Sequence, residues 1–137
     1  MGTNDIIKLA KKLRNYYQTN DPFKLCEFLN LEVREMNLNP KVYKAYTSNM
    51  FGEPVISINN KFTLKSQKIL CSHELGHAIL HSDSCCNEFE GNDQQKEYEA
   101  NLFAVSLLFD DNQFDLPICK MSNYMLQEIL NYNIQLK

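Results

Sequence analysis

Two histidines separated by three residues, with a glutamate after the first, form the part of this sequence best suited to chemistry. The segment reads His73-Glu74-Leu75-Gly76-His77. In a helix of 3.6 residues per turn, His73 and His77 lie one turn apart on the same face, so both imidazoles can bind one metal ion. Glu74 lies beside the first imidazole without being a ligand, which is the position of a general base acting on water. The spacing therefore predicts a catalytic zinc site.

The third ligand of such a site is expected further along the chain, because catalytic zinc usually has three protein ligands. The next predicted helix offers Glu97 and Glu99. Glu97 precedes Ala100, Asn101 and Ala104 by three, four and seven residues, so it shares the face expected to pack inward, whereas Glu99 points about 200° away from it. We expect Glu97 to be the ligand and keep Glu99 as the alternative. Asn101, one turn later, is expected to hydrogen-bond a ligand histidine.

Two other residues near the motif, His81 and Asp83, are weaker candidates for the site. His81 lies one turn beyond His77 on the same stripe, where it can contact bound substrate or a developing oxyanion, or stabilise the end of its helix through the helix dipole. Asp83 has the spacing of the third ligand in an extended zinc motif, and that motif requires glycine at position 80. Leu80 is found there, and this argues against Asp83.

The elements that must position these residues predict an α+β fold. We expect N-terminal helices, a small three-stranded antiparallel or mixed sheet, the helix with the zinc motif, and C-terminal helices. Periodicity places the helices at residues 5–17, 22–29, 63–82, 94–109 and 122–132, and the strands at 31–36, 42–50 and 54–59. Asn4 or Asp5 is expected to cap the first helix and Asp21 the second. Val55–Ile58 is a candidate edge strand, on which an extended substrate can pair.

Composition and charge limit the class of protein. The 137 residues are 44% hydrophobic and 23% charged, which is typical of one globular domain spanning residues 1–137. The formal net charge of −3 argues against direct nucleic-acid binding. Residues 1–72 carry +5 and residues 73–137 carry −8, so we expect the two halves to attract each other. With no membrane-spanning run, no signal peptide and an odd number of cysteines, we expect a cytoplasmic protein with reduced thiols.

Two segments, HELGHAILH at residues 73–81 and EYEANLFAVSLL at residues 97–108, resemble the ImmA/IrrE family of metallopeptidases. The resemblance implies a gluzincin-like zinc site made by His73, His77 and either Glu97 or Glu99, with Glu74 catalytic. It further implies a bacterial, phage or mobile-element protease that cleaves a helix-turn-helix repressor and derepresses phage, mobile-element or stress genes. The sequence departs from the family after Leu108, where Phe109-Asp110 replaces the common Met-Pro. A second hypothesis is a non-cleaving zinc-bound module, regulatory or toxin-like, that sequesters a DNA-binding partner.

Overall fold

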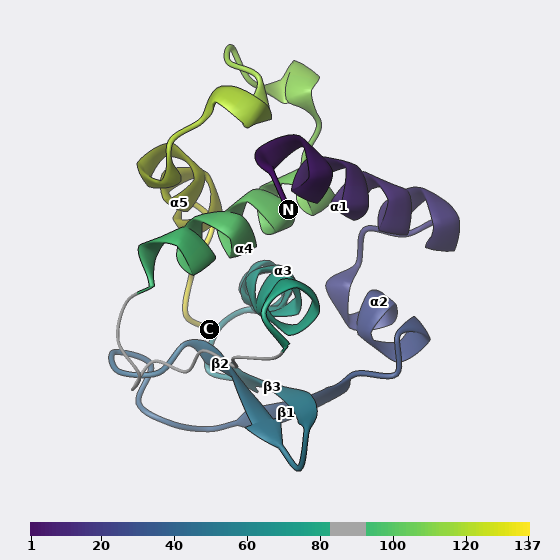
Figure 1. Cartoon of the computed structure of the whole chain (residues 1–137). Helices are drawn as coiled ribbons and strands as arrows, with labels where there is room; N and C mark the ends of the chain where they lie inside the picture. Colours follow the sequence, from purple (N-terminus) through teal and green to yellow (C-terminus); the bar gives the residue numbers. More distant parts are fainter. Residues whose placement is uncertain (83–92) are drawn as a thin grey trace.

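The computed structural model describes residues 1–82 and 93–137 and has the expected α+β architecture (Figure 1). The helices are α1 (Thr3–Tyr17), α2 (Pro22–Phe28), α3 (Leu64–Leu80), α4 (Gln94–Leu108) and α5 (Asn123–Asn131). The strands are β1 (Glu32–Met36), β2 (Ala45–Met50) and β3 (Glu53–Asn59). Two short 3-10 helices, η2 (Asp111–Gln113) and η3 (Ile118–Lys120), lie between α4 and α5. The segment between the predicted helices at 63–82 and 94–109 lies almost entirely outside the described residues.

The three strands form a mixed sheet in the order β1-β3-β2, with β3 parallel to β1 and antiparallel to β2. The expectation that Val55–Ile58 is an edge was therefore wrong, because β3 is hydrogen-bonded on both sides. The continuous burial of Val55 through Asn59 agrees with a central strand. β1 and β2 are the edge strands, and β2 is the one that lies over the motif helix.

β2 begins later than its β-rich sequence predicts, and the Asn39-Pro40 turn is the reason. The Asn39 carbonyl accepts hydrogen bonds from the backbone N–H groups of Val42 and Tyr43 at 3.0 and 2.9 Å. These groups are therefore committed to the turn and unavailable to the sheet. β2 and β3 form a hairpin whose loop has two residues, Phe51 and Gly52, with positive φ values of 57° and 85°.

Side-chain capping defines most helix starts where the sequence predicts them. Asp21 accepts from the Phe23 backbone N–H at 3.0 Å at the start of α2. The prediction for α1 was wrong, because its N-cap is Gly2. Asp5 is the third helical residue instead, and its carboxylate accepts the Gly2 backbone N–H at 3.1 Å.

α3 is the central element of the fold, with the sheet on one side and α4 on the other (Figure 1). Ile56 and Ile58 of β3, Leu75 of α3 and Phe103 of α4 are at most 1% exposed. Each such side chain contributes roughly 1.5–3 kcal/mol by leaving water. α1 and α5 both pack against α4. The motif helix is therefore fixed from several directions.

The charge asymmetry of the sequence is visible as contacts between the N-terminal helix and the segment after α4. Arg14 forms an ion pair with Asp110 at 2.8 Å, and Lys11 approaches Asp111 at 3.8 Å. These exposed pairs contribute little individually. Among the described residues, no helix is both long and apolar enough to cross a bilayer.

Candidate metal centre

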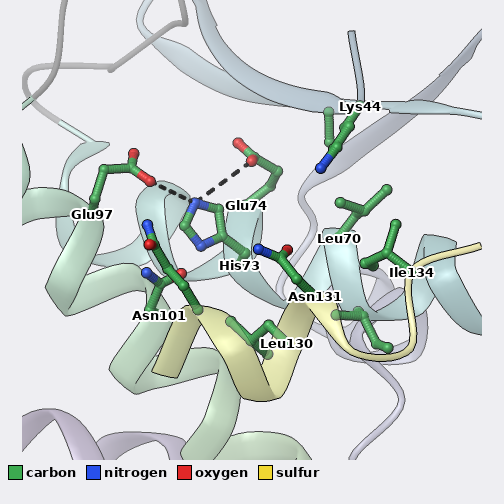
Figure 2. A pocket seen from close by; sticks show the side chains of 12 residues that line it. Lys44, Leu70, His73, Glu74, Glu97, Asn101, Leu130, Asn131 and Ile134 are labelled. Atoms are coloured by element: carbon green, nitrogen blue, oxygen red, sulfur yellow. Dashed lines mark ion pairs between the residues drawn. The ribbon is translucent and has the colours of Figure 1, made fainter. Parts of the chain in front are cut away.

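His73, His77 and Glu97 meet where α3 faces the first turn of α4. The Glu97 carboxylate places Oε2 at 3.2 Å from His73 Nε2 and Oε1 at 3.0 Å from His77 Nε2. One ligand atom from each residue can be chosen so that all lie within 4.8 Å of one another. Figure 2 shows Glu97 reaching toward the His73 ring from its own helix. The helical spacing and the inward face of α4 thus bring together the three residues that the sequence favours as ligands.

The cluster has the dimensions and donor types that zinc requires. Two ligands at about 2.0–2.1 Å from a tetrahedral ion are separated by about 3.3 Å. The two carboxylate-to-imidazole distances, 3.2 and 3.0 Å, are close to that separation. Two imidazoles and one carboxylate form a usual catalytic zinc set, which leaves a fourth position for water or substrate. The residues present therefore fit a divalent metal ion.

Glu74 lies on the other side of His73 from Glu97 (Figure 2). Its Oε1 accepts a hydrogen bond from the Thr47 hydroxyl at 2.8 Å, and the same hydroxyl lies 3.2 Å from the Glu74 backbone carbonyl. Its Oε2 lies 3.9 Å from His73 Nε2. Thr47 is 1% exposed and Glu74 is 7% exposed. One carboxylate oxygen is thus fixed by β2, while the other faces the ligand cluster.

His81 and Glu99 form a second contact that adjoins the cluster. His81 Nε2 lies 2.8 Å from Glu99 Oε1, and His81 Nδ1 lies 3.0 Å from His77 Nδ1. Glu99 therefore contacts the third histidine, whereas Glu97 contacts the first two. Both ring nitrogens of His81 are engaged by protein atoms, and His81 is not among the residues that line the adjoining pocket. Asp83 lies outside the described residues.

Asn101 is buried beside the cluster, as its position one turn after Glu97 indicates. Its side chain donates a hydrogen bond to Asn123 Oδ1 at 2.7 Å. Asn123 is the first residue of α5. Asn101 therefore connects α4 to the C-terminal helix, and it lines the same pocket as the candidate ligand His73.

Charge and burial shift the pKa values of the cluster in opposite directions. Burial lowers the pKa of His73, but the Glu97 hydrogen bond and the Glu74 charge outweigh it, so this pKa lies above its usual value. Burial raises the pKa of Glu97, yet hydrogen bonds from His73 and His77 reverse the effect and hold it well below its usual value. Burial lowers the pKa of His81, and the Glu99 hydrogen bond offsets this only in part. Glu97 is therefore an anion at neutral pH, as a metal ligand must be.

A pocket of about 180 Å³ opens beside His73, Glu74 and Glu97. Its walls combine apolar side chains from α3 and the C-terminal region with polar side chains. The apolar residues are Ile69, Leu70, Leu130 and Ile134, and the polar ones are Lys44, Asn101, Gln127 and Asn131. In Figure 2 the Lys44 ammonium group points toward this space. The candidate metal cluster therefore adjoins a space that can receive part of a substrate.

Comparison with known proteins agrees with the site. Residues 26–128 match the M78 peptidase family through its IrrE N-terminal-like domain. The chain belongs to this family. It is also 31% identical over 115 residues to uncharacterized immunity region protein 2 of Bacillus phage phi105, an alignment that covers 80% of this chain and 72% of that protein. No solved structure matches the chain. The ImmA/IrrE resemblance is thus confirmed, and with it a metallopeptidase type of domain.

Thr47 is the main site residue of this M78 domain that the sequence analysis did not identify. Thr47 comes 27 residues before Glu74 in the chain. It reaches Glu74 only because β2 is paired with β3 and lies over α3. Thr47 is buried at an alternate position of a short strand, together with Ala45, and this burial is visible only in the folded structure. The pocket residues of the C-terminal region, Leu130, Asn131 and Ile134, were likewise assigned no role. Of these, only Leu130 follows the helical spacing that indicates core packing.

Proposed function

We propose that this chain is a zinc-dependent endopeptidase that cleaves a helix-turn-helix transcriptional repressor in the cytoplasm, and so derepresses phage, mobile-element or stress genes. The observation that carries the proposal is the convergence of His73, His77 and Glu97 beside a pocket, with the Glu74 Oε2 atom facing the same cluster. The M78 family supports peptide-bond hydrolysis. The similarity to a phage immunity region protein supports a role in controlling phage genes.

His73, His77 and Glu97 would hold the ion, which when bound supplies Lewis acidity to the scissile carbonyl and to water. Glu74 takes a proton from the attacking water as the oxygen–carbon bond forms. It then gives that proton to the departing amine nitrogen as the carbon–nitrogen bond breaks. The Thr47 hydroxyl holds Oε1 of Glu74 throughout, so that Oε2 stays directed at the reacting groups. The hydrogen bond to Oε1 thus orients the Glu74 carboxylate, and Oε2 carries the proton during the reaction.

The substrate is expected to bind along β2. Among the described residues β2 pairs with β3 alone, so its other edge can add an extended peptide through backbone hydrogen bonds. Lys44, just before the first residue of β2, lines the pocket beside the cluster. The apolar walls at Leu70, Leu130 and Ile134 fit an apolar side chain next to the scissile bond. An unfolded or extended segment of the repressor would meet both requirements.

Glu74→Gln tests the proposal, because it keeps the shape and removes the base. Wild-type protein, Glu74→Gln and the control Glu128→Gln, which changes an exposed charge on α5, are loaded with zinc and incubated with each helix-turn-helix repressor from the same genome. Mass spectrometry should detect one fixed new terminus with wild type and the control, and none with Glu74→Gln at equal zinc content. An intact complex without fragments from wild type would refute cleavage and favour sequestration. Cleavage by zinc-loaded Glu74→Gln would refute the role of Glu74.

A further inference from the structure

Both ring nitrogens of His77 have close partners. Nε2 lies 3.0 Å from Glu97 Oε1, and Nδ1 lies 3.0 Å from His81 Nδ1. His77 is 4% exposed and His81 is 7% exposed, so bulk water does not replace these contacts. A neutral imidazole carries one N–H donor and one acceptor nitrogen, and only the nitrogen without a proton can bind a metal. For Nε2 of His77 to be a ligand, its proton must therefore be on Nδ1.

A proton on His77 Nδ1 needs an acceptor, and His81 Nδ1 is the atom placed to accept it. His81 can accept there only if its own proton is on Nε2. The Glu99 Oε1 atom lies 2.8 Å from that nitrogen, and an ionised carboxylate can only accept. Gln95 donates to the other Glu99 oxygen at 3.3 Å, which helps to hold the carboxylate in place. The identity of Glu99 thus selects the tautomer of His81, which in turn selects that of His77.

Counting protons supports the same conclusion. The groups Glu97, His77, His81 and Glu99 form a row with three contacts, and each contact needs one positive centre or one proton. Two neutral imidazoles supply two protons. These satisfy the contact between His77 and His81 and the contact between His81 and Glu99. A metal ion supplies the remaining positive centre between Glu97 and His77, so the row is fully satisfied when the ion is bound.

We propose that Glu99 and His81 are positioning residues that hold His77 with its proton on Nδ1 and its lone pair on Nε2, directed at the metal. This inference rests on the proposed metal site but not on the substrate or on the reaction. Outer partners that orient a ligand histidine in this way typically change metal affinity 10–100-fold when they are removed. Here the partner of the ligand is itself a histidine, and the carboxylate acts through it.

The test combines zinc affinity with direct observation of the tautomers. Zinc dissociation constants are measured by chelator competition for wild type, Glu99→Ala, Glu99→Gln and the control Glu128→Ala. The tautomers of His77 and His81 are read from long-range proton–nitrogen NMR spectra of the zinc-loaded proteins. We expect Glu99→Ala to bind zinc 10–100-fold more weakly and to lose the Nε2–H form of His81. Glu99→Gln should retain more of the zinc affinity and more of the Nε2–H form of His81 than Glu99→Ala, because its amide oxygen can still accept a hydrogen bond. Glu128→Ala should match wild type.

The outcomes separate this inference from the proposed function. Zinc bound by wild type with His81 protonated on Nδ1 would overturn the inference, and this observation needs no variant to fold. Zinc affinity of Glu99→Ala within twofold of wild type, with the His81 tautomer unchanged, would overturn it as well. Either result leaves the zinc peptidase intact. Failure of wild type to bind zinc would overturn the proposed function and the inference together.

Discussion

Gly76 lies inside the zinc motif at a place where α3 closely approaches α4, and an added methyl group there should disturb both stability and the site. A Cβ atom at this position would lie 3.1 Å from Ala100 Cα, 3.2 Å from the Ala100 carbonyl oxygen and 3.2 Å from Phe103 Cβ. All three distances fall below the ordinary contact range of 3.4–4 Å. Two of the three atoms belong to the α4 backbone, so a side-chain rotation cannot relieve the contact. α4 must therefore shift by a few tenths of an ångström.

Two effects of Gly76→Ala oppose each other. Replacing glycine by alanine inside a helix gains about 1 kcal/mol from backbone entropy. Overpacking of a close helix contact costs about 1–3 kcal/mol. We therefore expect the metal-free protein to lose between about 0 and 2 kcal/mol of unfolding free energy, despite the better helix former. The same shift moves Glu97 relative to His73 and His77, so each tenfold loss of zinc affinity removes a further 1.4 kcal/mol or so of zinc-dependent stabilisation.

Urea denaturation with and without a fixed excess of zinc measures both effects. Wild type, Gly76→Ala and Gly76→Ser should form a series of decreasing stability, because serine adds an oxygen to the same contact. The difference in unfolding free energy between wild type and each variant should be larger in zinc than in chelator. If Gly76→Ala were more stable than wild type by about 1 kcal/mol in both conditions, the close helix approach would not be what the glycine provides.

Three further predictions concern the base, the pocket and the charges of the cluster. Thr47→Val should lose about 1–3 kcal/mol of stability and most peptidase activity, because buried Glu74 loses its hydrogen-bond donor. Thr47→Ser should retain both the stability and the activity. Equal denaturation curves and equal cleavage rates for the two variants would contradict this role of the Thr47 hydroxyl. Ile134→Ala should lower kcat/KM about tenfold for a peptide with an apolar residue at the scissile bond, and Ile134→Val should lower it less; unchanged kinetics would exclude Ile134 from the substrate pocket. In chelator, the Glu97 contribution to stability is present above the ordinary carboxyl pKa of 4.5 and is lost as pH falls through its depressed pKa. The matching contribution of His73 is present below pH 6.5 and is lost as pH rises through its raised pKa. Glu97→Gln should therefore cost more unfolding free energy at pH 5.5 than at pH 9, and an equal cost would argue against the pairing.

The helices and the candidate ligands could be predicted because their determinants are local. Periodicity and capping residues such as Asp21 define helix starts within the chain segment itself. The spacing of His73 and His77 places both on one face of any helix, and the inward face of α4 favours Glu97 over Glu99. Each of these inferences needs only the geometry of one helix.

Strand order and the Thr47 contact could not be predicted, because they depend on partners far apart in sequence. Val55–Ile58 has the same β-rich composition in the centre of a sheet as at an edge, and only its parallel pairing with β1 makes it central. Thr47 acquires its contact with Glu74 from the packing of β2 on α3. Glu99 also gains its partner, His81, only from the relative placement of two helices.

The proposed function requires that His73, His77 and Glu97 hold one divalent metal ion, and metal analysis of the purified protein can measure this. Wild type, Glu97→Gln and Glu128→Gln are purified without chelator, incubated with zinc, desalted and analysed by inductively coupled plasma mass spectrometry. We expect about one equivalent of metal per chain in wild type and Glu128→Gln and a large loss in Glu97→Gln. Wild-type protein that contains no metal and takes up no added zinc, or Glu97→Gln with full metal content, would contradict it.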